Sequence, residues 1–234
     1  MNEIYIFTDG SSLGNPGPGG FGVIIVDGEK VKELGGGEKH TTNNRMELSA
    51  TISALREIGQ TAQKIVLRTD SSYVINGITK WVFGWKKNNW ITSQKQEVLN
   101  RDLWENLSSL TLGKKIQWEY VGGHIGVPGN ERADKIAVAF AMGGKDFELY
   151  DGILSEYHLT NILDISHDAG QKESRSKNKQ HSRAKAYSYL SLVDGKIMKH
   201  TTWAECEARV KGKKAKYKKA TSKEEEESII KDWS

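Results

Sequence analysis

Cysteine is nearly absent from this chain of 234 residues, since Cys206 is the only one. A single cysteine excludes a disulfide within the chain and a zinc site built from several cysteines. No apolar run approaches the length of a membrane span. The first residues, MNEIYIF, lack the basic segment and apolar core of a secretion signal. We therefore expect a soluble, cytoplasmic, monomeric protein with no membrane partner.

The residues that are present suffice for a packed core, because 37% of them are hydrophobic. The length suits one domain of ordinary size and a small second one. The pattern predicts a first domain over residues 1–144, a partly ordered extension and basic linker over 145–185, and a small second domain over 186–234. Net charge is only +4, but residues 209–219 (RVKGKKAKYKK) hold seven basic residues and no acidic one. Such a run favours a polyanionic partner.

Secondary-structure signals predict an α/β fold, with a mixed sheet flanked by helices and a small α+β C-terminal domain. Alternating apolar patterns in the first domain predict strands near residues 3–9, 20–27, 31–38, 64–70 and 115–121. Helical periodicity predicts helices over residues 43–58, 71–81, 100–112 and 130–142. Strands first, followed by alternation with helices, are typical of such a sheet.

Four carboxylates have an unusual placement in these elements. Asp9 and Asp70 each end a strand that reads as central, while Glu47 and Asp134 lie in early turns of helices. Simpler interpretations exist for each acid taken alone. Asp9 suits a turn, Asn44 and Glu47 have the spacing of a capping box, and an acid near a helix N-terminus, such as Asp134, is favourable.

Taken together, the four acids indicate a metal site. Carboxylates crowded at one end of a sheet repel one another unless they share hard cations, and oxygen ligands suit Mg²⁺ or Mn²⁺. Two such ions, about 4 Å apart, can stabilise the attacking and leaving oxygens of phosphoryl chemistry. His124, in a glycine-containing loop before Asp134, could then carry a proton or assist product release.

The stretches TDGSSLGNPGPGG, TTNNRMEL, TDSSYVINGITKW and GHIGVPGNERADKIA resemble the motifs of type 1 ribonuclease H in its bacterial form. The resemblance covers residues 1–144 and implies a five-stranded mixed sheet. It also implies an endoribonuclease that hydrolyses the RNA strand of RNA–DNA hybrids and leaves 5′-phosphate and 3′-hydroxyl ends. By the same resemblance, two Mg²⁺ ions, with Mn²⁺ as a substitute, are held by Asp9, Glu47, Asp70 and Asp134, and His124 is catalytic.

Substrate contacts are expected from short polar groups around the acids and from a basic helix. Recognition of 2′-hydroxyls needs donors and acceptors close to the metals. The candidates are Gly10, Ser11, Ser12, Asn15, Asn43 and Asn44. Thr42 resembles the family residue that helps seat a DNA-strand phosphate, although Thr42 and Asn43 could also simply cap the helix. The segment ITKWVFGWKKNNW resembles the family's basic protrusion, which grips the DNA strand. Its candidate contacts are Trp81, Trp85, Lys86 and Lys87, although tryptophans can equally pack inward.

The C-terminal stretch TTWAECEARVKGKKAKYKKATSKEEEE resembles the hybrid-binding domain of animal ribonuclease H1, where that domain is N-terminal. The resemblance implies that Trp203 and Tyr217 stack on DNA sugars and that Lys218 and Lys219 contact phosphates. The alternative is a charged, solvated tail with Trp203 in its own core.

Three other functions fit the sequence less well. A related exonuclease would carry an Asp-x-Glu pair on the first strand, whereas Asp9 is followed by Gly10-Ser11. A catalytically inactive hybrid-binding protein would have lost one of the acids. A transposase or integrase core would lack both the His124 loop and the protrusion.

Overall fold

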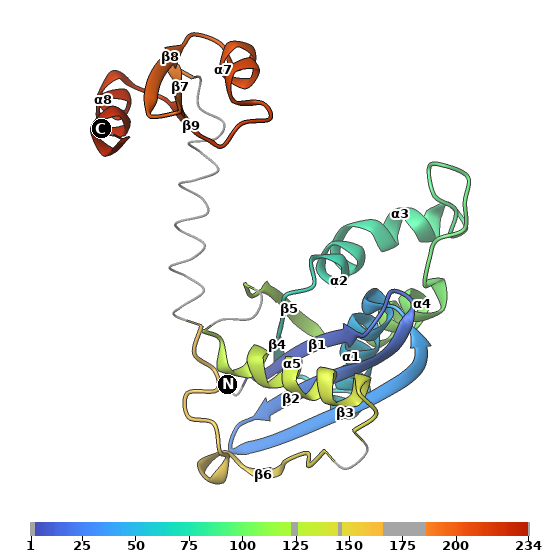
Figure 1. The fold of residues 1–234 in the computed structure, drawn as a ribbon. Coiled ribbons are helices and arrows are strands. Elements are labelled where there is room, and N and C mark those ends of the chain that lie inside the picture. Colours follow the sequence, from blue (N-terminus) through green and yellow to red (C-terminus); the bar gives the residue numbers. More distant parts are fainter. Residues whose placement is uncertain (1–2, 123–125, 145–146, 166–185, 234) are drawn as a thin grey trace. The chain divides into compact units, whose positions relative to one another are not determined.

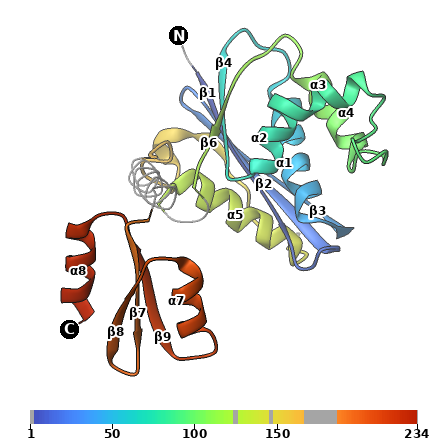
Figure 2. The same cartoon turned by 90° about the horizontal axis from the view of Figure 1, so that it is seen from above.

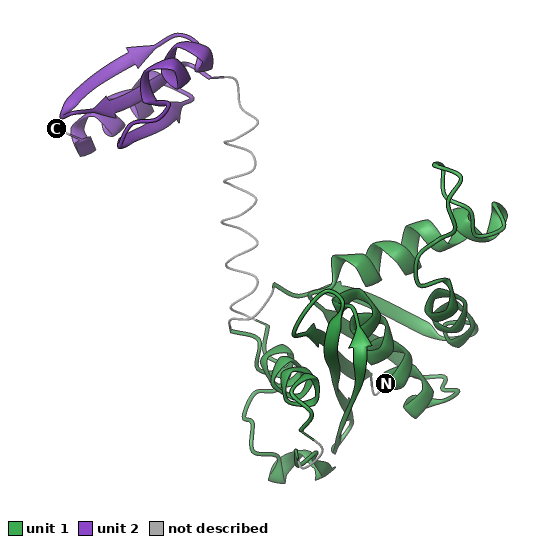
Figure 3. Ribbon diagram, turned by 45° about the vertical axis from the view of Figure 1, so that its right-hand side comes forward, with its two compact units in different colours: residues 1–171 green, residues 172–234 purple. Residues whose placement is uncertain are grey.

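The computed structural model describes residues 3–122, 126–144, 147–165 and 186–233. The chain forms two compact units, Met1–Gln171 and Lys172–Ser234 (Figure 3). Residues 147–165 therefore belong to the first unit. The predicted linker falls largely on residues 166–185, which lie outside the described residues, so the predicted domain limits stay predictions.

The first unit is built on a six-stranded mixed sheet with the order β5-β4-β1-β2-β3-β6. Strand β1 pairs antiparallel with β2 and parallel with β4. The predicted mixed sheet is confirmed, with one strand more than expected, because residues 151–153 add β6 to the outer edge of β3. The strands are β1 (Ile4–Ser12), β2 (Gly17–Asp27), β3 (Lys30–Thr41), β4 (Lys64–Thr69), β5 (Lys115–Tyr120) and β6 (Asp151–Ile153).

Helices cover both faces of this sheet, which explains why its central strand is apolar on both sides. α1 (Asn43–Ile58) lies on one face and α5 (Pro128–Ala141) on the other (Figure 1). Ile4 and Ile6 of β1 belong to the core beneath α1, whereas Phe7 belongs to the core beneath α5. The prediction that this strand is central in the sheet is thus confirmed.

A helical arm follows β4 and extends away from the sheet (Figure 1). The helix predicted over residues 71–81 is longer than expected and contains one π-helical turn, Gly77–Trp81, between α2 and α3. A short loop then leads to α4, which packs back toward α1 through Leu107 and Trp104. The arm's helices are α2 (Ser72–Asn76), α3 (Val82–Lys87) and α4 (Arg101–Leu110).

The second unit is a three-stranded antiparallel sheet, β8-β7-β9, lying between α7 and α8 (Figure 2). Leu190, Ala220 and Ile229 form its small core. The strand β9 was not predicted, because its lysines obscure the alternation. Its elements are β7 (Ser188–Val193), β8 (Lys196–His200), α7 (Trp203–Val210), β9 (Ala215–Ala220) and α8 (Lys223–Trp233). None of the described helices is long and apolar enough to cross a membrane.

Candidate active site

Asp9 lies where two neighbouring strands separate. The parallel pairing of β1 with β4 stops at Thr8 and Thr69, and Asp70 follows directly. The pairing of β1 with β2 continues to Ser12. The prediction that the strand ends at Asp9 is therefore wrong, because β2 still supplies hydrogen-bond partners beyond it. The separation leaves Asp9 and Asp70 at the same end of the sheet.

Glu47 reaches this end of the sheet because α1 approaches β1 closely. A Cβ atom on Gly10 would lie only 2.3 Å from the backbone nitrogen of Glu47, so this contact requires glycine. The Glu47 carboxylate accepts hydrogen bonds from Asn43 Nδ2, at 3.0 Å, and from the Ser71 hydroxyl. These bonds fix the carboxylate toward the loop that follows β4.

The N-terminus of α1 is capped by Thr42 and not by the capping box of Asn44 and Glu47 that the sequence spacing allowed. Thr42 is the N-cap residue of α1, and its hydroxyl accepts a hydrogen bond from the Arg45 N–H. The capping box of Asn44 and Glu47 is therefore not formed, since the cap lies two residues earlier. This leaves the Glu47 carboxylate available for the site.

Asp134 enters the group from the opposite face of the sheet. It lies half-buried on α5, and its negative charge contributes to raising the pKa of Asp9. His124 lies outside the described residues, so its catalytic role stays a prediction. The structure thus brings together Asp9, Glu47 and Asp70 with Asp134.

Burial and mutual repulsion favour the neutral forms of two of these acids. Burial, followed by repulsion from Asp70, Asp134 and Glu47, raises the pKa of Asp9 from 3.8 to about 8 although the Gly10 N–H hydrogen bond lowers it. Burial also raises the pKa of Glu47, to about 7, and Asp70 adds to the effect, while the Ser71 hydroxyl opposes it. An acid with such a pKa is poised for protonation or for a positive partner.

One oxygen of Asp9 lacks the partner that such burial demands. Asp9 is 5% exposed; its Oδ1 accepts a 2.7 Å hydrogen bond from the Gly10 N–H, and its Oδ2 is buried without a hydrogen bond in the structure. A buried, unsatisfied acceptor surrounded by carboxylates fits a cation. In the described part of the chain, no group of three or more His, Cys, Asp or Glu side chains is close enough together to hold an ion as it stands.

Some of the predicted polar substrate contacts make hydrogen bonds within the protein, and others are exposed. Thr42 caps α1, and Asn43 holds Glu47, while Asn44 and Asn15 are exposed. The remaining candidates, Gly10, Ser11 and Ser12, form the part of β1 that continues past β4.

The aromatic residues of the arm form one cluster with a buried and an open side. Trp85 packs among Trp81, Trp90 and Trp104, with ring centroids 5.6–6.3 Å apart. Trp104 is buried, whereas Trp81 is exposed. Lys86 donates to the Ser108 hydroxyl. Lys87 is exposed. The alternative that a tryptophan of this segment packs inward is therefore confirmed for Trp90, which is buried, whereas Trp81 and Lys87 are exposed.

In the second unit, three aromatic rings lie side by side on the face of α7. Trp203 is 5.7 Å from Tyr189 and 5.4 Å from Tyr217 between ring centroids, and it is 40% exposed. Lys219 is paired with Tyr189 and shares its face, whereas Lys218 is paired with Leu190 and points to the other face. The structure thus groups Trp203, Tyr217 and Lys219, and separates Lys218 from them.

Sequence reasoning missed the role of Ser71 at the site. Ser71 caps α2 by accepting a hydrogen bond from the Val74 N–H. It also donates to Glu47. The signal that could have shown the contact with Glu47 is the position of Ser71, which directly follows the candidate ligand Asp70 in the sequence.

Comparison with known proteins agrees with this geometry. The family model for RNase H matches residues 1–142. The chain belongs to the ribonuclease H family. It is therefore a nuclease of this family, as the resemblance predicted.

Curated ribonucleases H are similar to this member of the family over nearly their whole length. Ribonuclease H of Alcanivorax borkumensis is 53% identical over 137 residues, which cover 58% of this chain and 90% of that protein. Ribonuclease H of a Bradyrhizobium species is 54% identical over 134 residues, covering 57% and 86%. The family-model match ends at residue 142, so the second unit lies outside it.

Solved structures of ribonucleases H share the fold. LC9-RNase H1, described as a type 1 RNase H with the type 2 active-site motif, superposes with a TM-score of 0.59 and 30% identity, covering 69% of this chain and 82% of that one. The foamy viral protease–reverse transcriptase solved with an RNA/DNA hybrid has a TM-score of 0.50 and 19% identity, covering 61% and 20%. The second likeness concerns the fold alone.

Proposed function

We propose that this ribonuclease H is an endonuclease that hydrolyses the RNA strand of RNA–DNA hybrids with two divalent cations, Mg²⁺ or alternatively Mn²⁺. The observation that carries the proposal is the buried, unpartnered Oδ2 of Asp9. Burial, together with repulsion from three further carboxylates, raises the pKa of Asp9 to about 8. Membership of the family supports the substrate, and the donor set supports the cations, since all four candidate ligands are carboxylates.

In this proposal Asp9, Glu47, Asp70 and Asp134 would hold the ions through their carboxylate oxygens. When bound, two such ions activate water and neutralise charge on the scissile phosphate, leaving 5′-phosphate and 3′-hydroxyl ends. Ser71 and Asn43 orient the Glu47 carboxylate through their hydrogen bonds. His124 carries a proton or assists product release.

In this proposal the hybrid contacts two regions of the first unit, the end of β1 and the helical arm. The backbone groups of Gly10, Ser11 and Ser12, and the hydroxyls of the two serines, offer donors and acceptors to RNA 2′-hydroxyls. Trp81 and Lys87 are exposed on the arm, where they suit the DNA backbone.

The second unit binds the hybrid as well, in our proposal. The supporting observation is the open aromatic group of Trp203, Tyr189 and Tyr217 beside a lysine-rich strand. Exposed rings interleaved with lysines suit stacking combined with phosphate contacts. A protein-docking surface is the alternative that hybrid-binding measurements on residues 186–234 would reveal.

The test is an assay on matched RNA–DNA, RNA–RNA and DNA–DNA duplexes, each with Mg²⁺ and with EDTA. We expect cleavage of the RNA strand of the hybrid alone, and only with Mg²⁺. End-labelled products should carry 5′-phosphates and 3′-hydroxyls. Cleavage that persists in EDTA would contradict the metal-dependent mechanism, and equal cleavage of RNA–RNA would contradict the substrate assignment.

A further inference from the structure

The helix α5, which carries Asp134, packs against glycine residues of β2. A Cβ atom on Gly22 of β2 would be 2.1 Å from the carbonyl oxygen of Ala133, and one on Gly20 would be 2.3 Å from that of Ala137. Backbone therefore meets backbone beneath α5. Such contact sets the height of the helix above the sheet, but at these positions no side chain of β2 stops the helix from sliding or turning.

Ile136 of α5 packs into the core with Phe7 and Ile24, and an ion pair adds a polar restraint on the helix. Arg132 of α5 binds Glu33 of β3 through two hydrogen bonds, Nε to Oε1 at 2.7 Å and Nη2 to Oε2 at 2.8 Å. Residues two apart on a helix point about 200° apart around its axis, so Arg132 and Asp134 lie on opposite flanks of α5. A rotation that moved Arg132 would move Asp134 as well.

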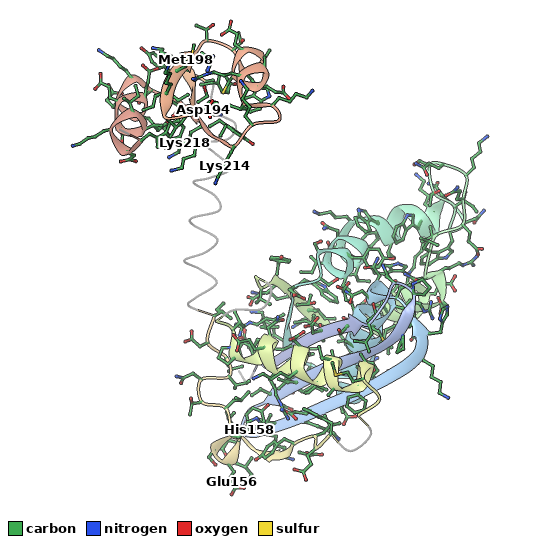
Figure 4. All side chains as sticks on the ribbon, in the orientation of Figure 1. Glu156, His158, Asp194, Met198, Lys214 and Lys218 are labelled. Atoms are coloured by element: carbon green, nitrogen blue, oxygen red, sulfur yellow. The ribbon has the colours of Figure 1, made fainter. Side chains whose placement is uncertain are left out.

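The segment 147–165, called here the extension, completes this ion pair. It lies on the β6 side of the sheet, where Figure 4 labels its residues Glu156 and His158. The Tyr157 hydroxyl donates to Oε1 of Glu33, and the Tyr150 backbone N–H donates to Oε2 at 3.0 Å. The Phe147 ring lies 4.9 Å from the Arg132 guanidinium. Both partners of the ion pair are therefore held by the extension.

Glu33 depends on these donors because its side chain is fully buried. Burial favours its neutral form, but the hydrogen bonds from Arg132, Tyr157 and Tyr150 outweigh burial and lower the pKa of Glu33. Removing one donor from a buried charge is strongly unfavourable. The buried charge of Glu33 is therefore satisfied jointly by Arg132 and by the extension.

We propose that the extension is a positioning element of the active site: through Tyr157 and Glu33 it holds Arg132, and thereby fixes the rotation of α5 that presents Asp134 to the cations. This inference rests on the proposed function, in which Asp134 is a ligand. The extension begins beyond residues 1–142, which the family model matches.

The test uses the full-length chain with Tyr157→Phe, which removes a single hydroxyl and keeps the ring. Asp151→Asn is the matched control, because Asp151 lies on the same extension and only pairs with exposed Lys32, at 3.5 Å. Phe147→Leu is a second, independent variant that removes the ring over Arg132. Mg²⁺ binding is measured by calorimetric titration without substrate, and kcat and KM are measured over a range of Mg²⁺ concentrations, well below the Tm.

We expect Tyr157→Phe and Phe147→Leu to weaken Mg²⁺ binding by about tenfold, as loss of a group that orients a metal ligand typically does. KM for the hybrid should stay unchanged, kcat should recover at high Mg²⁺, and Asp151→Asn should match the wild type. A lower Tm with unchanged Mg²⁺ affinity would show a purely stabilising role and overturn the inference. A wild-type chain that binds no divalent cation would instead overturn the proposed function.

Discussion

At the scale of single residues, Asp9 has the most demanding environment among the candidate ligands. It is nearly fully buried, one of its oxygens has no hydrogen bond, and three acids repel its charge. Such an arrangement is unfavourable for folding unless a bound cation offsets it. Both of the following predictions come from this conflict.

Asp9→Asn should abolish cleavage while leaving the fold and hybrid binding intact, because asparagine keeps the size of the side chain but removes a charge shared by both proposed cations. Turnover on a hybrid at saturating Mg²⁺ is the measurement, with binding checked in EDTA. A loss of no more than tenfold corresponds to about 1.4 kcal/mol of barrier. That would be too little for a central ligand and would contradict the assignment.

Asp9 should also make the metal-free protein less stable as the pH rises. The pKa of Asp9 is about 8 in the folded chain and ordinarily 3.8, so between these values the folded state holds a proton that the unfolded state has released. The free energy of unfolding then falls by about 1.4 kcal/mol per pH unit from this group. Asp9→Asn should flatten that dependence in denaturant titrations at pH 5 and pH 8 with EDTA.

Asp102 provides a control of opposite sign for that experiment. The hydrogen bond from the Arg45 guanidinium lowers the pKa of Asp102, so its contribution to stability is present at neutral pH and is lost on acidification. Asp102→Asn should therefore lower stability at neutral pH. A gain in stability in both variants would point to a general charge effect rather than to the environment of Asp9.

At the scale of elements, strand alternation in β9 decides which lysine can serve the aromatic face. Lys219 shares that face with Trp203 and Tyr217, whereas Lys218 points to the other one. The resemblance implied that Lys218 and Lys219 both contact phosphate. Because β9 was not recognised as a strand, the sequence did not show that the two lysines point to opposite faces of the sheet.

Lys219→Ala should reduce the salt dependence of hybrid binding by residues 186–234 by about one unit of log–log slope, since each phosphate contact releases about 0.9 counterions. Lys218→Ala is its neighbour on the opposite face and should leave the slope unchanged. Trp203→Ala should weaken binding by about 1–3 kcal/mol at every salt concentration. Equal effects of the two lysines in a binding titration would place the ligand elsewhere.

The elements also show what the sequence could and could not predict. The helix over residues 43–58 and the grouping of Asp9, Glu47 and Asp70 follow from periodicity and strand ends, which are local properties. The docking of the extension is not local, because Glu33 and Tyr157 are 124 positions apart. Glu33 lies two residues after buried Val31 in β3 and is itself buried, but a buried acid cannot be matched to its donors without coordinates.

At the scale of the whole molecule, the chemistry resides in the first unit. All four candidate ligands lie within residues 1–142, and the extension ends before residue 166. The second unit has its own sheet and core. In the proposed function, the chain therefore separates cleavage in the first unit from additional binding in the second.

Deletion of residues 172–234 should leave an active enzyme, because the first unit and its extension remain complete. On short hybrids kcat should be unchanged, while on long hybrids KM should rise and fewer cuts should follow each encounter. Product-length distributions under single-hit conditions measure this. If the truncated chain behaves like the full chain on long hybrids, the second unit does not bind substrate.

The strand β6 has a consequence for solubility. It covers the outer edge of β3 at residues 30–32, where that strand would otherwise offer unpaired backbone groups to another molecule. A chain ending at residue 144 would lose both β6 and the Tyr150 carbonyl that accepts from the Glu33 N–H at 2.7 Å. Light scattering across a dilution series should show that this shortened chain self-associates, whereas the chain ending at residue 171 stays dispersed.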